Sequence, residues 1–328
     1  MNKTHLHHIL NQYIARYDEL NNEYNNEGYK WDAEECFKKN WNIDAVDFKT
    51  MFKDAFKEMS NLIDNATVQP VGGITMLLNY PDEIPFVREC FRELFSEDGG
   101  NLDTRQTRIT NFMEKINSHI EKYAKGSWKY PQKMNTVIYY LNLWKPDENY
   151  IYKSTEATEW ANCIEYGDDF GSGSTFRLKK YYAMCDELLE ELKKNDTIMQ
   201  LYNERMASIK NFHDQGHILV YDIIYCSKCY SLYQSIPTLK KLSTKQRILL
   251  AETTEMREKL SDKLNIIQAE LEKLSCNPAH PDIVGEHVKH KTWGSGTIVS
   301  CDNGVMEIKF NIGIKNSSIL TVSTNTSF

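Results

Sequence analysis

Long apolar runs, proline and glycine are all scarce in this sequence. No stretch of about 18 consecutive apolar residues occurs in the 328 residues, so we expect no membrane-spanning helix. The first residues, Met-Asn-Lys-Thr-His, do not begin the apolar core of a signal peptide, so we expect no secretory leader. Only 8 Pro and 15 Gly are present, and the frequent use of Asn, Lys and Ile is typical of an AT-rich bacterial genome.

Cysteine and positive charge are also limited. The 8 Cys are scattered along the chain and do not form the dense framework of a secreted disulfide-rich domain. We therefore expect reduced thiols and a cytoplasmic protein. The formal net charge of −7 argues against a broad electrostatic grip on duplex DNA, because that affinity comes from phosphate neutralisation. A net charge of −7 is still compatible with a local basic groove.

Several catalytic motifs are absent. The sequence has no Gly-x-x-x-x-Gly-Lys-Ser/Thr phosphate loop of an NTPase and no Gly-x-Ser-x-Gly elbow of a hydrolase. The tripeptide Asp169-Phe170-Gly171 matches a protein-kinase motif, but the glycine-rich and catalytic loops of a kinase are missing. The sequence therefore favours a binding function over an enzyme.

The pattern of the chain predicts an α+β protein with four parts. A helical region over 1–66 and a mixed α/β body over 67–238 contain most of the aromatic residues, which we interpret mainly as core. The run from His217 to Cys226 is rich in β-branched and aromatic residues, which predicts a strand buried on both faces in a small sheet. A long helix over 239–277 and a β-rich module over 283–328 follow.

The long helix carries an apolar seam. Its apolar residues step by 4, 3, 4 and 3 positions, which is a pattern of about two heptads. The seam consists of Leu260, Leu264, Ile267, Leu271 and Leu274. It fits a helix packed on the body, a spacer, or the interface of a homodimer.

One part of the body interleaves aromatic and basic residues. Aromatic side chains could stack on bases while lysines contact phosphates, which predicts a groove for nucleic acid or a partner. The set is Trp128, Lys129, Tyr130, Trp144, Lys145, Tyr150, Tyr152 and Lys153. Core packing explains these aromatics equally well. The loop Gly171–Ser174, which precedes a basic helix, is either a phosphate site or a mobile linker.

A zinc site is one hypothesis for the body. His213-x-x-x-His217, followed by Cys226-x-x-Cys229, offers four ligands for a tetrahedral ion. Ordinary residues at the ends of a buried strand would give the same pattern. The alternatives for a cofactor are therefore none or zinc.

A metal-dependent nuclease is the alternative to a binding protein. Pro281-Asp282, followed by Glu307-Ile308-Lys309, matches the spacing of a nuclease that holds a metal with two carboxylates beside a lysine. Alternation along one strand accounts for Glu307 and Lys309 without a metal, so the motif alone does not establish a nuclease.

The last 45 or so residues alternate between short strands and turns. We expect strands at 284–288, 297–301, 305–310 and 318–322, with a turn over 311–315. Asn303-Gly304 favours a type I′ hairpin turn, and Met306, Ile308 and Phe310 alternate as inward-facing residues. Strands this short bury a core only by curling into a small barrel.

The start of this module carries a specific motif. The pattern is Gly285-x-x-Val288-x-His290-x-x-Trp293-Gly294-x-Gly296-x-Ile298. It resembles the opening of the C-terminal Tudor/SH3-like barrel of UvrD- and PcrA-type DNA helicases. The resemblance implies turns at Gly285, Gly294 and Gly296. It also implies that His290 and Trp293 form a surface for a partner or a base, unless Trp293 plugs the barrel end.

In that family the barrel is an adaptor that contacts RNA polymerase and nucleic acid. No motor accompanies it here, so the resemblance implies the fold and the adaptor role alone. Segments of the body such as Tyr150-x-Tyr152-Lys153 resemble modules of bacterial phage-defence and restriction loci. We therefore expect a non-catalytic adaptor or nucleic-acid-associated protein of phage defence or DNA transactions. Its partner protein would be RNA polymerase, a helicase or a nuclease.

Overall fold

The computed structural model describes residues 1–63, 68–124, 129–236, 249, 253, 256, 259–270, 283–302 and 305–318. The chain divides into two compact units, Met1–Glu252 and Thr253–Phe328. We call the first unit the body, and residues 283–302 and 305–318 of the second the sheet module. The predicted regions 1–66 and 67–238 both lie in the body, where they share one hydrophobic core.

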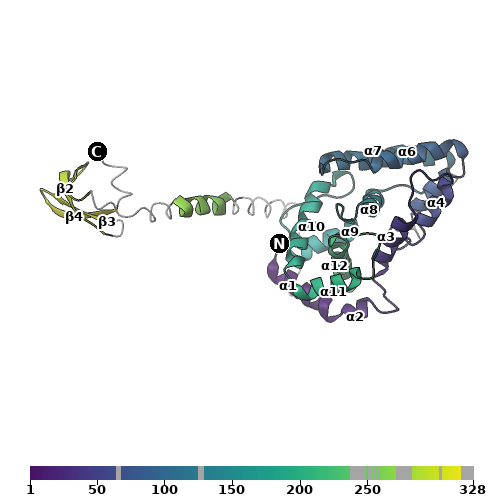
Figure 1. Ribbon diagram of the computed structural model, residues 1–328, viewed down its shortest axis with the longest axis horizontal. Helices are drawn as coiled ribbons and strands as arrows, with labels where there is room; N and C mark the ends of the chain where they lie inside the picture. Colours follow the sequence, from purple (N-terminus) through teal and green to yellow (C-terminus); the bar gives the residue numbers. More distant parts are fainter. Residues whose placement is uncertain are drawn as a thin grey trace. The chain divides into compact units, whose positions relative to one another are not determined.

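The body is built from helices (Figure 1). They are α1 (Lys3–Ala15), α2 (Tyr17–Leu20), α3 (Tyr29–Asn40), α4 (Phe48–Ala55), α5 (Pro70–Leu77), η1 (Pro81–Glu83), α6 (Ile84–Leu94), α7 (Leu102–Tyr123), α8 (Met134–Trp144), α9 (Ser154–Cys163), η2 (Gly173–Thr175), α10 (Leu178–Lys193), α11 (Asp196–Met206) and α12 (His217–Cys229). The described residues of the body contain no strand, so the small sheet predicted there is wrong. Helices with a small antiparallel sheet near the C-terminus confirm the α+β class.

The predicted strand from His217 to Cys226 is instead part of the central helix α12. Nine of its 13 residues are buried, and it packs against α1, α3, α9 and α10. A helix that is surrounded by other helices needs no polar face, so its sequence lacks the period that distinguishes a helix from a buried strand. Tertiary packing here overrides the β-propensity of branched and aromatic residues.

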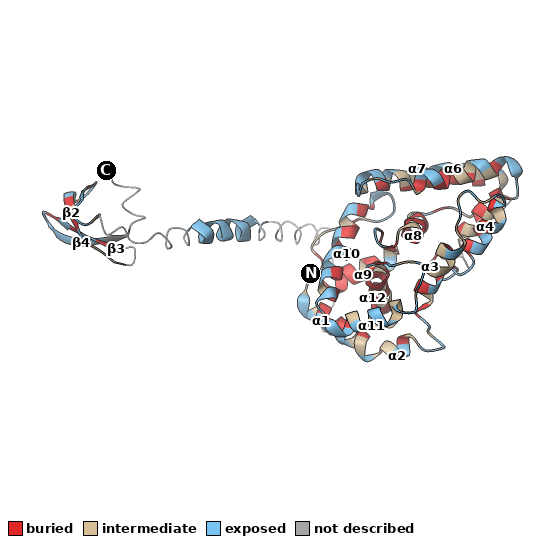
Figure 2. Cartoon of the chain, in the orientation of Figure 1, coloured by how far each residue is buried: buried red, intermediate tan, exposed pale blue. Residues whose placement is uncertain are grey.

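The long helix α7 is the second centre of the body. Asn101 caps it, because its side-chain oxygen accepts hydrogen bonds from the backbone N–H groups of Asp103 and Thr104 at 3.1 and 3.0 Å. The buried face of α7 includes Ile109 and Phe112 and packs against α5, α6, α8 and α10. Figure 2 shows buried residues along α8, α9 and α12. Since α10 contacts both α7 and α12, the two groups of helices form one core.

The sheet module is an antiparallel meander (Figure 1). Its strands pair in chain order and are β1 (His287–His290), β2 (Gly294–Asp302), β3 (Val305–Phe310) and β4 (Gly313–Ser318). β1 begins three residues later than expected, and β3 coincides with its predicted strand. β2 begins at Gly294, three residues before the predicted start, so Gly294 and Gly296 lie in a strand and not in the predicted turn. Within the described residues β1 does not pair with β4, so this sheet is open and the barrel stays a prediction.

The fourth strand differs from the prediction. The sequence predicts a turn over 311–315 and a strand over 318–322, but β4 already starts at Gly313, which pairs with Phe310. Gly313 has a φ of 119°, a conformation that glycine adopts without strain, and this permits a short turn. Residues 319–322 lie outside the described residues.

A small apolar core stabilises the sheet module. Its buried residues are Val288, Ile298, Met306, Ile308 and Phe310. β3 alternates between exposed and buried positions, as its sequence indicates. Gly285 and Gly294 have positive φ values of 103° and 78°. Gly296 serves packing instead, because a Cβ atom there would lie 2.6 Å from Cδ1 of Phe310.

Residues 259–270 of the predicted long helix are helical. Leu260, Leu264 and Ile267 are 55, 56 and 53% exposed, whereas Leu271 and Leu274 lie outside the described residues. The seam therefore presents apolar side chains on the helix surface. None of the helices in the described ranges is both long and apolar enough to cross a membrane.

Candidate binding sites

The two aromatic residues implied as a binding surface lie together in the sheet module. His290 ends β1 and Trp293 lies in the turn before β2, and their ring centroids are 4.0 Å apart at an interplanar angle of 14°. Nδ1 of His290 accepts hydrogen bonds from the backbone N–H groups of Thr292 and Trp293 at 3.2 and 3.3 Å. The imidazole thereby holds the turn and the indole together.

This His290–Trp293 stack is anchored in the core of the module and lies near a cation. The ring of Phe310 lies 5.6 Å from Trp293 and 6.0 Å from His290, between centroids. Nζ of Lys315 lies 6.0 Å from the Trp293 ring centroid. Both stacked rings are partly exposed. An aromatic surface beside an ammonium group is the combination that binds bases and phosphates of single-stranded nucleic acid.

The sheet module is also less acidic than the rest of the chain. Residues 283–318 contain 4 Lys and 3 acidic residues, so their formal charge is +1. Because the whole chain has a formal charge of −7, the rest of the chain has a charge of −8. Lys289 and Lys291 are exposed close to the stack in sequence. Electrostatics therefore favours the module over the body as a general contact for nucleic acid.

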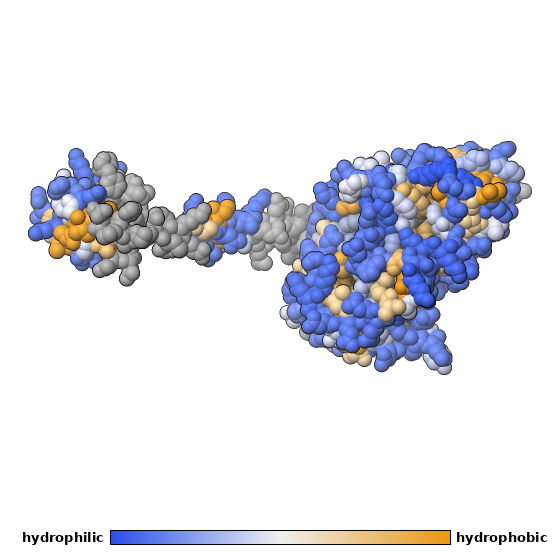
Figure 3. All heavy atoms as spheres, viewed as in Figure 1, coloured by the Kyte–Doolittle hydropathy of each residue, from blue (hydrophilic) through white to orange (hydrophobic). Residues whose placement is uncertain are grey.

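Branched aliphatic side chains are exposed on the same module. Val305, Ile312 and Ile314 are 43, 64 and 56% exposed. Figure 3 shows apolar side chains on the visible face of the module, whereas the visible surface of the body is largely hydrophilic. Ile312 and Ile314 lie at the β3–β4 turn, whereas Val305 lies at the other end of β3 opposite Ser318. Neighbouring exposed apolar residues such as Ile312 and Ile314 are typical of a surface that contacts another protein.

The groove predicted in the body is not one surface. Trp128 lies outside the described residues, and Lys129 is exposed. Tyr130 packs over Gly73, where an added Cβ atom would lie 2.8 Å from Cβ of Tyr130. Tyr150 is buried, and its hydroxyl donates a hydrogen bond to Oδ1 of Asp186 at 2.7 Å. Tyr130 and Tyr150 are therefore engaged in packing, which is the alternative to a binding groove that the sequence also allows.

Trp144 and Lys145 lie at the C-terminal end of α8. The Trp144 ring stacks on Phe95 with centroids 5.5 Å apart, and Nζ of Lys145 lies 2.7 Å from Glu97 and 2.8 Å from Glu148. Because α8 has 11 residues, its two ends are about 15 Å apart. The prediction thus combined residues from opposite ends of one helix.

Tyr152 and Lys153 line a cavity at the other end of α8. The cavity has a volume of about 1010 Å³. Its lining includes Lys133 and Ser154, at the starts of α8 and α9, and Ser174 of η2. No sequence pattern points to Lys133, since the two helix starts meet only in the folded chain. Gly173 and Ser174 of the loop Gly171–Ser174, which the sequence predicts as a phosphate site or a mobile linker, contribute to the same lining.

The four predicted zinc ligands do not meet. His217 and Cys226 are nine residues apart on α12, which separates them by about 13 Å along the helix axis. His213 is exposed before the helix, and Cys229 is exposed at its end. Nδ1 of His217 instead lies 2.7 Å from the backbone oxygen of Asp214. The helix α12 thus keeps the histidines and the cysteines of the zinc hypothesis at its opposite ends.

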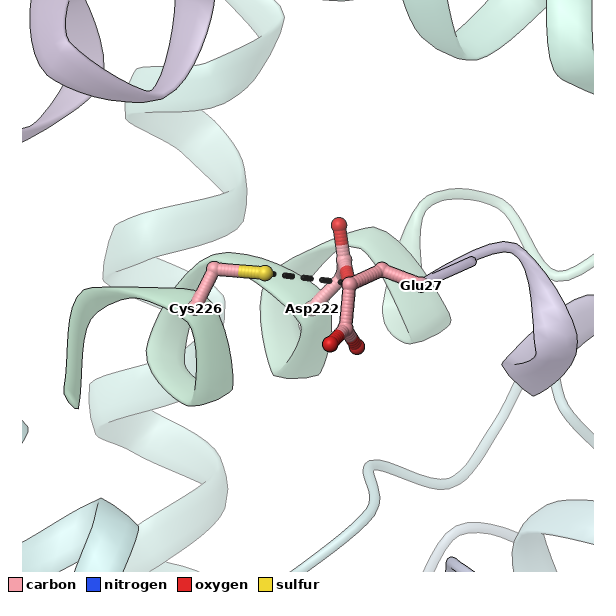
Figure 4. Close-up of side chains that lie close together, drawn as sticks. All are labelled: Glu27, Asp222 and Cys226. Carbon is pink, nitrogen blue, oxygen red and sulfur yellow. Dashed lines mark hydrogen bonds between the residues drawn. The ribbon is translucent and has the colours of Figure 1, made fainter. Parts of the chain in front are cut away.

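A different set of potential ligands converges inside the body (Figure 4). Asp222 and Cys226 lie one turn apart on α12, with Sγ of Cys226 3.6 Å from Oδ1 of Asp222, and Glu27 comes from the segment before α3. All three are buried, and among the described residues they form the one group of at least three such side chains. Burial raises the pKa of Cys226, which disfavours the thiolate that a metal needs.

The ammonium group of Lys30 already lies between these carboxylates. Its Nζ lies 2.7 Å from Oδ1 of Asp222 and also contacts Oε2 of Glu27. Tyr13 donates a hydrogen bond to Asp222 at 2.6 Å, and Tyr230 donates one to Glu27. Burial alone would lower the pKa of Lys30, but the charges of Asp222 and Glu27 raise it above its ordinary value. Lys30 offsets one of the two carboxylate charges, and the Tyr13 and Tyr230 hydroxyls donate hydrogen bonds to the carboxylates. Groups of the protein itself therefore hold this buried ion cluster, which favours a structural role.

The nuclease residues are only partly described. Asp282 lies outside the described residues, whereas Glu307 and Lys309 are exposed on the outward face of β3. The Ser300 hydroxyl donates a hydrogen bond to Oε2 of Glu307 at 2.9 Å. Both residues occupy the exposed positions of an alternating strand, which is the interpretation that needs no metal.

No protein-family model matches this chain, and comparisons with curated proteins and with solved structures find no match. The resemblance of the sheet module to the UvrD- and PcrA-type barrel therefore rests on its sequence motif.

Proposed function

We propose that this chain is a non-catalytic adaptor that binds single-stranded nucleic acid through its sheet module. The observation that carries the proposal is the His290–Trp293 stack with Lys315 beside it. Stacking on one aromatic ring contributes about 1–3 kcal/mol per base. Lys289 and Lys291 add the positive charge that phosphate contacts require.

An unpaired strand fits this surface better than a duplex. Bases in a duplex are stacked on one another, so an exposed indole reaches them only when the strand is open. The acidic balance of the rest of the chain also opposes a wide contact with duplex phosphates. The resemblances noted in the sequence support a role for such an adaptor in bacterial DNA transactions or phage defence.

Fluorescence anisotropy of the full chain with a labelled single-stranded oligonucleotide tests this proposal. We expect salt-dependent binding, and Lys291→Glu should reduce the slope of log K against log salt by about 1. Trp293→Leu should cost about 1–3 kcal/mol of binding, whereas Trp293→Phe keeps an aromatic ring and should cost less.

The matched control is Lys193→Glu, which makes the same charge change at an exposed position of α10. It should leave binding unchanged. Wild-type protein that does not bind the strand would contradict the proposal, and cleavage of the oligonucleotide with Mg²⁺ would contradict a non-catalytic role in favour of the nuclease alternative.

A protein partner is a second candidate, favoured by the exposed Val305, Ile312 and Ile314. RNA polymerase, a helicase or a nuclease would bind this apolar surface while the stack holds nucleic acid. Ile312→Lys with Ile314→Lys should abolish capture of purified RNA polymerase by the full chain and leave oligonucleotide binding intact. Capture that survives both substitutions would remove this surface from consideration.

We also propose that the seam of Leu260, Leu264 and Ile267 pairs two copies of the chain. The three side chains are more than half exposed on one helix, and burial of such side chains is the usual driving force for pairing of helices. Light scattering should give twice the chain mass of 38.3 kDa, and Leu264→Lys should return it to one chain. A monomeric wild-type protein would refute the pairing.

A further inference from the structure

The cavity between the starts of α8 and α9 is lined by the first turns of both helices. From α8 and the residue before it come Lys133, Met134, Asn135 and Thr136, and from α9 and the residue before it come Lys153, Ser154, Thr155 and Glu156. The first N–H groups of a helix have no intrahelical partner and carry partial positive charge. Neither helix has a side-chain cap that accepts hydrogen bonds from these groups.

Both helices also carry a lysine at the N-cap position, where the helix dipole favours a negative charge. Nζ of Lys153 donates a hydrogen bond to the backbone oxygen of Asn61 at 3.1 Å, which holds it at the cavity. The one acidic residue of the lining, Glu156, lies 3.1 Å from Nζ of Lys228, which offsets its charge. Lys133 and Lys153 thus bring positive charge to the lining of the cavity.

A buried hydroxyl gives an independent indication of a ligand. Tyr152 lines the cavity and is 2% exposed, yet its hydroxyl has no hydrogen-bond partner of normal geometry among the described residues. Burial raises the pKa of Tyr152, and the Ser154 side chain partly opposes this rise without completing a bond of normal geometry. A buried polar group without a partner costs about 1–3 kcal/mol, and a ligand oxygen would relieve that cost.

The rest of the lining is apolar enough for more than a bare phosphate. Ile63, Met113, Met134 and Phe176 contribute to it, and the Phe176 ring lies 4.1 Å from that of Tyr152. Gln106 fixes this side, because its amide donates to the Phe176 oxygen at 2.7 Å. The volume of about 1010 Å³ is at the upper end of the range of small-molecule sites.

We propose that this cavity binds the terminal phosphate of a nucleotide, either free or at the end of a nucleic acid strand. The N–H groups at the starts of α8 and α9, the two lysines and the Tyr152 hydroxyl hold the phosphate. The apolar side chains contact the base or sugar. The site lies in the body and does not depend on the binding surface of the sheet module.

Calorimetry of the full chain tests this with AMP against adenosine, and with a 5′-phosphorylated oligonucleotide against its 5′-hydroxyl form. We expect the phosphate to improve the dissociation constant at least about tenfold, which one good charge-assisted contact supplies. Binding of AMP identifies a free nucleotide as ligand, and binding of only the phosphorylated strand identifies a strand end. Equal binding of the phosphate-free forms, or no binding of either phosphate form, would overturn the proposal.

Two variants leave the fold intact and test the residues. Lys133 is exposed, and Tyr152→Phe removes a hydroxyl that has no partner, so neither Lys133→Glu nor Tyr152→Phe should lower the melting temperature. Lys133→Glu should weaken phosphate binding about tenfold or more and Tyr152→Phe several-fold, whereas Lys193→Glu should have no effect. Trp293→Leu should leave AMP binding unchanged, which separates this site from the sheet module. Unchanged binding in both cavity variants would refute the assignment.

Discussion

The body and the sheet module bury different kinds of side chain. In the body, Lys30, Glu34 and Arg105 are 1, 0 and 2% exposed, among many aliphatic and aromatic residues. In the described part of the module, the buried side chains are all apolar, and there are five of them. One unit therefore stabilises ionised and ionisable groups in its interior, whereas the other does not.

The difference follows from the size of the two cores. A buried charge is tolerated only when other groups hydrogen-bond to it and compensate it, which takes several neighbouring residues. The body supplies such partners from helices far apart in sequence, as in the contact of Lys30 with Asp222. A core of five residues would lose much of its apolar area to one charged group. The stability of the body should therefore depend on pH and on its ionic partners. The stability of the module should depend on its apolar volume.

The largest expected effect is the loss of the folded module in Phe310→Ala. Phe310 contacts Trp293 and closes over Gly296, so the substitution removes a large share of a small core. Phe→Ala in a core costs about 3–5 kcal/mol, more than five buried side chains can absorb. Hydrogen exchange measured by mass spectrometry on the full chain should show that residues 287–318 lose protection. Protection of the body should not change.

Ile314→Ala is the matched control, since Ile314 neighbours Phe310 in the sheet but is 56% exposed. Its effect on protection should be small. If Phe310→Ala also deprotected the body, the two units would not be independent, and the comparison would fail.

The module was the easier unit to predict from sequence because alternation along a strand reports directly which side is buried. Met306, Ile308 and Phe310 follow that rule. In the body the rule fails for α12, because a helix buried on all sides has no polar face to reveal its period. The predicted position of β4 is wrong because the tight turn before it depends on a φ of 119° at Gly313. Glycine permits this φ but also adopts others, so the sequence does not determine the turn.

The next effect in size tests the buried ion cluster of the body. Lys30→Met leaves Glu27 and Asp222 buried without their cation, which should lower the free energy of unfolding by about 3–5 kcal/mol. Lys193→Met removes a lysine from an exposed pair with Glu190 and should cost about 0–1 kcal/mol. Urea unfolding followed by circular dichroism measures both. Equal effects would mean that burial of the cluster contributes nothing.

Binding residues were harder to predict than core residues. Tyr152 and Lys153 do line a cavity, but other parts of its lining come from segments about 20 or more residues away, such as Lys133, Ser174 and Gln106 of α7. Trp144 and Lys145 share the composition of that set and lie at the wrong end of α8. Composition identifies the residue types of a site, whereas only packing decides which of them meet.

A smaller effect, of about 2 kcal/mol, should come from Asp98 and depend on pH. Its carboxylate accepts two hydrogen bonds from Arg105 at 2.8 Å, which lower the pKa of Asp98 to about 2. Because the ordinary pKa is about 4, this stabilisation is present above pH 4 and is lost as the pH falls towards 2. Asp98→Asn should destabilise the body at pH 7, and the difference from wild type should shrink between pH 4 and pH 2.

Urea unfolding at pH 7, 4 and 2.5 measures this effect. The exposed Asp54→Asn is the control and should follow the wild type at each pH. A gap between Asp98→Asn and wild type that does not change with pH would show that packing, and not the charge of Asp98, accounts for the loss.

The last effect has the opposite sign and concerns Glu34. This carboxyl group is completely buried on α3, and neither oxygen has a hydrogen-bond partner. Burial raises the pKa of Glu34 well above its ordinary value, although Lys38 opposes this. Between the unfolded pKa of about 4.3 and the native one, the folded protein binds the extra proton, so stability falls as pH rises.

Glu34→Gln removes that dependence while it keeps the shape of the side chain. The variant should match the wild type near pH 4 and become more stable than it at higher pH, with a slope of at most about 1.4 kcal/mol per pH unit for one proton. Hydrogen exchange should locate the gain in the body and leave 287–318 unchanged, because no described residue of the module buries a charge. A gain that appeared equally in both units would show that the variant acts on the unfolded chain, and the contrast between the two cores would then not explain their response to pH.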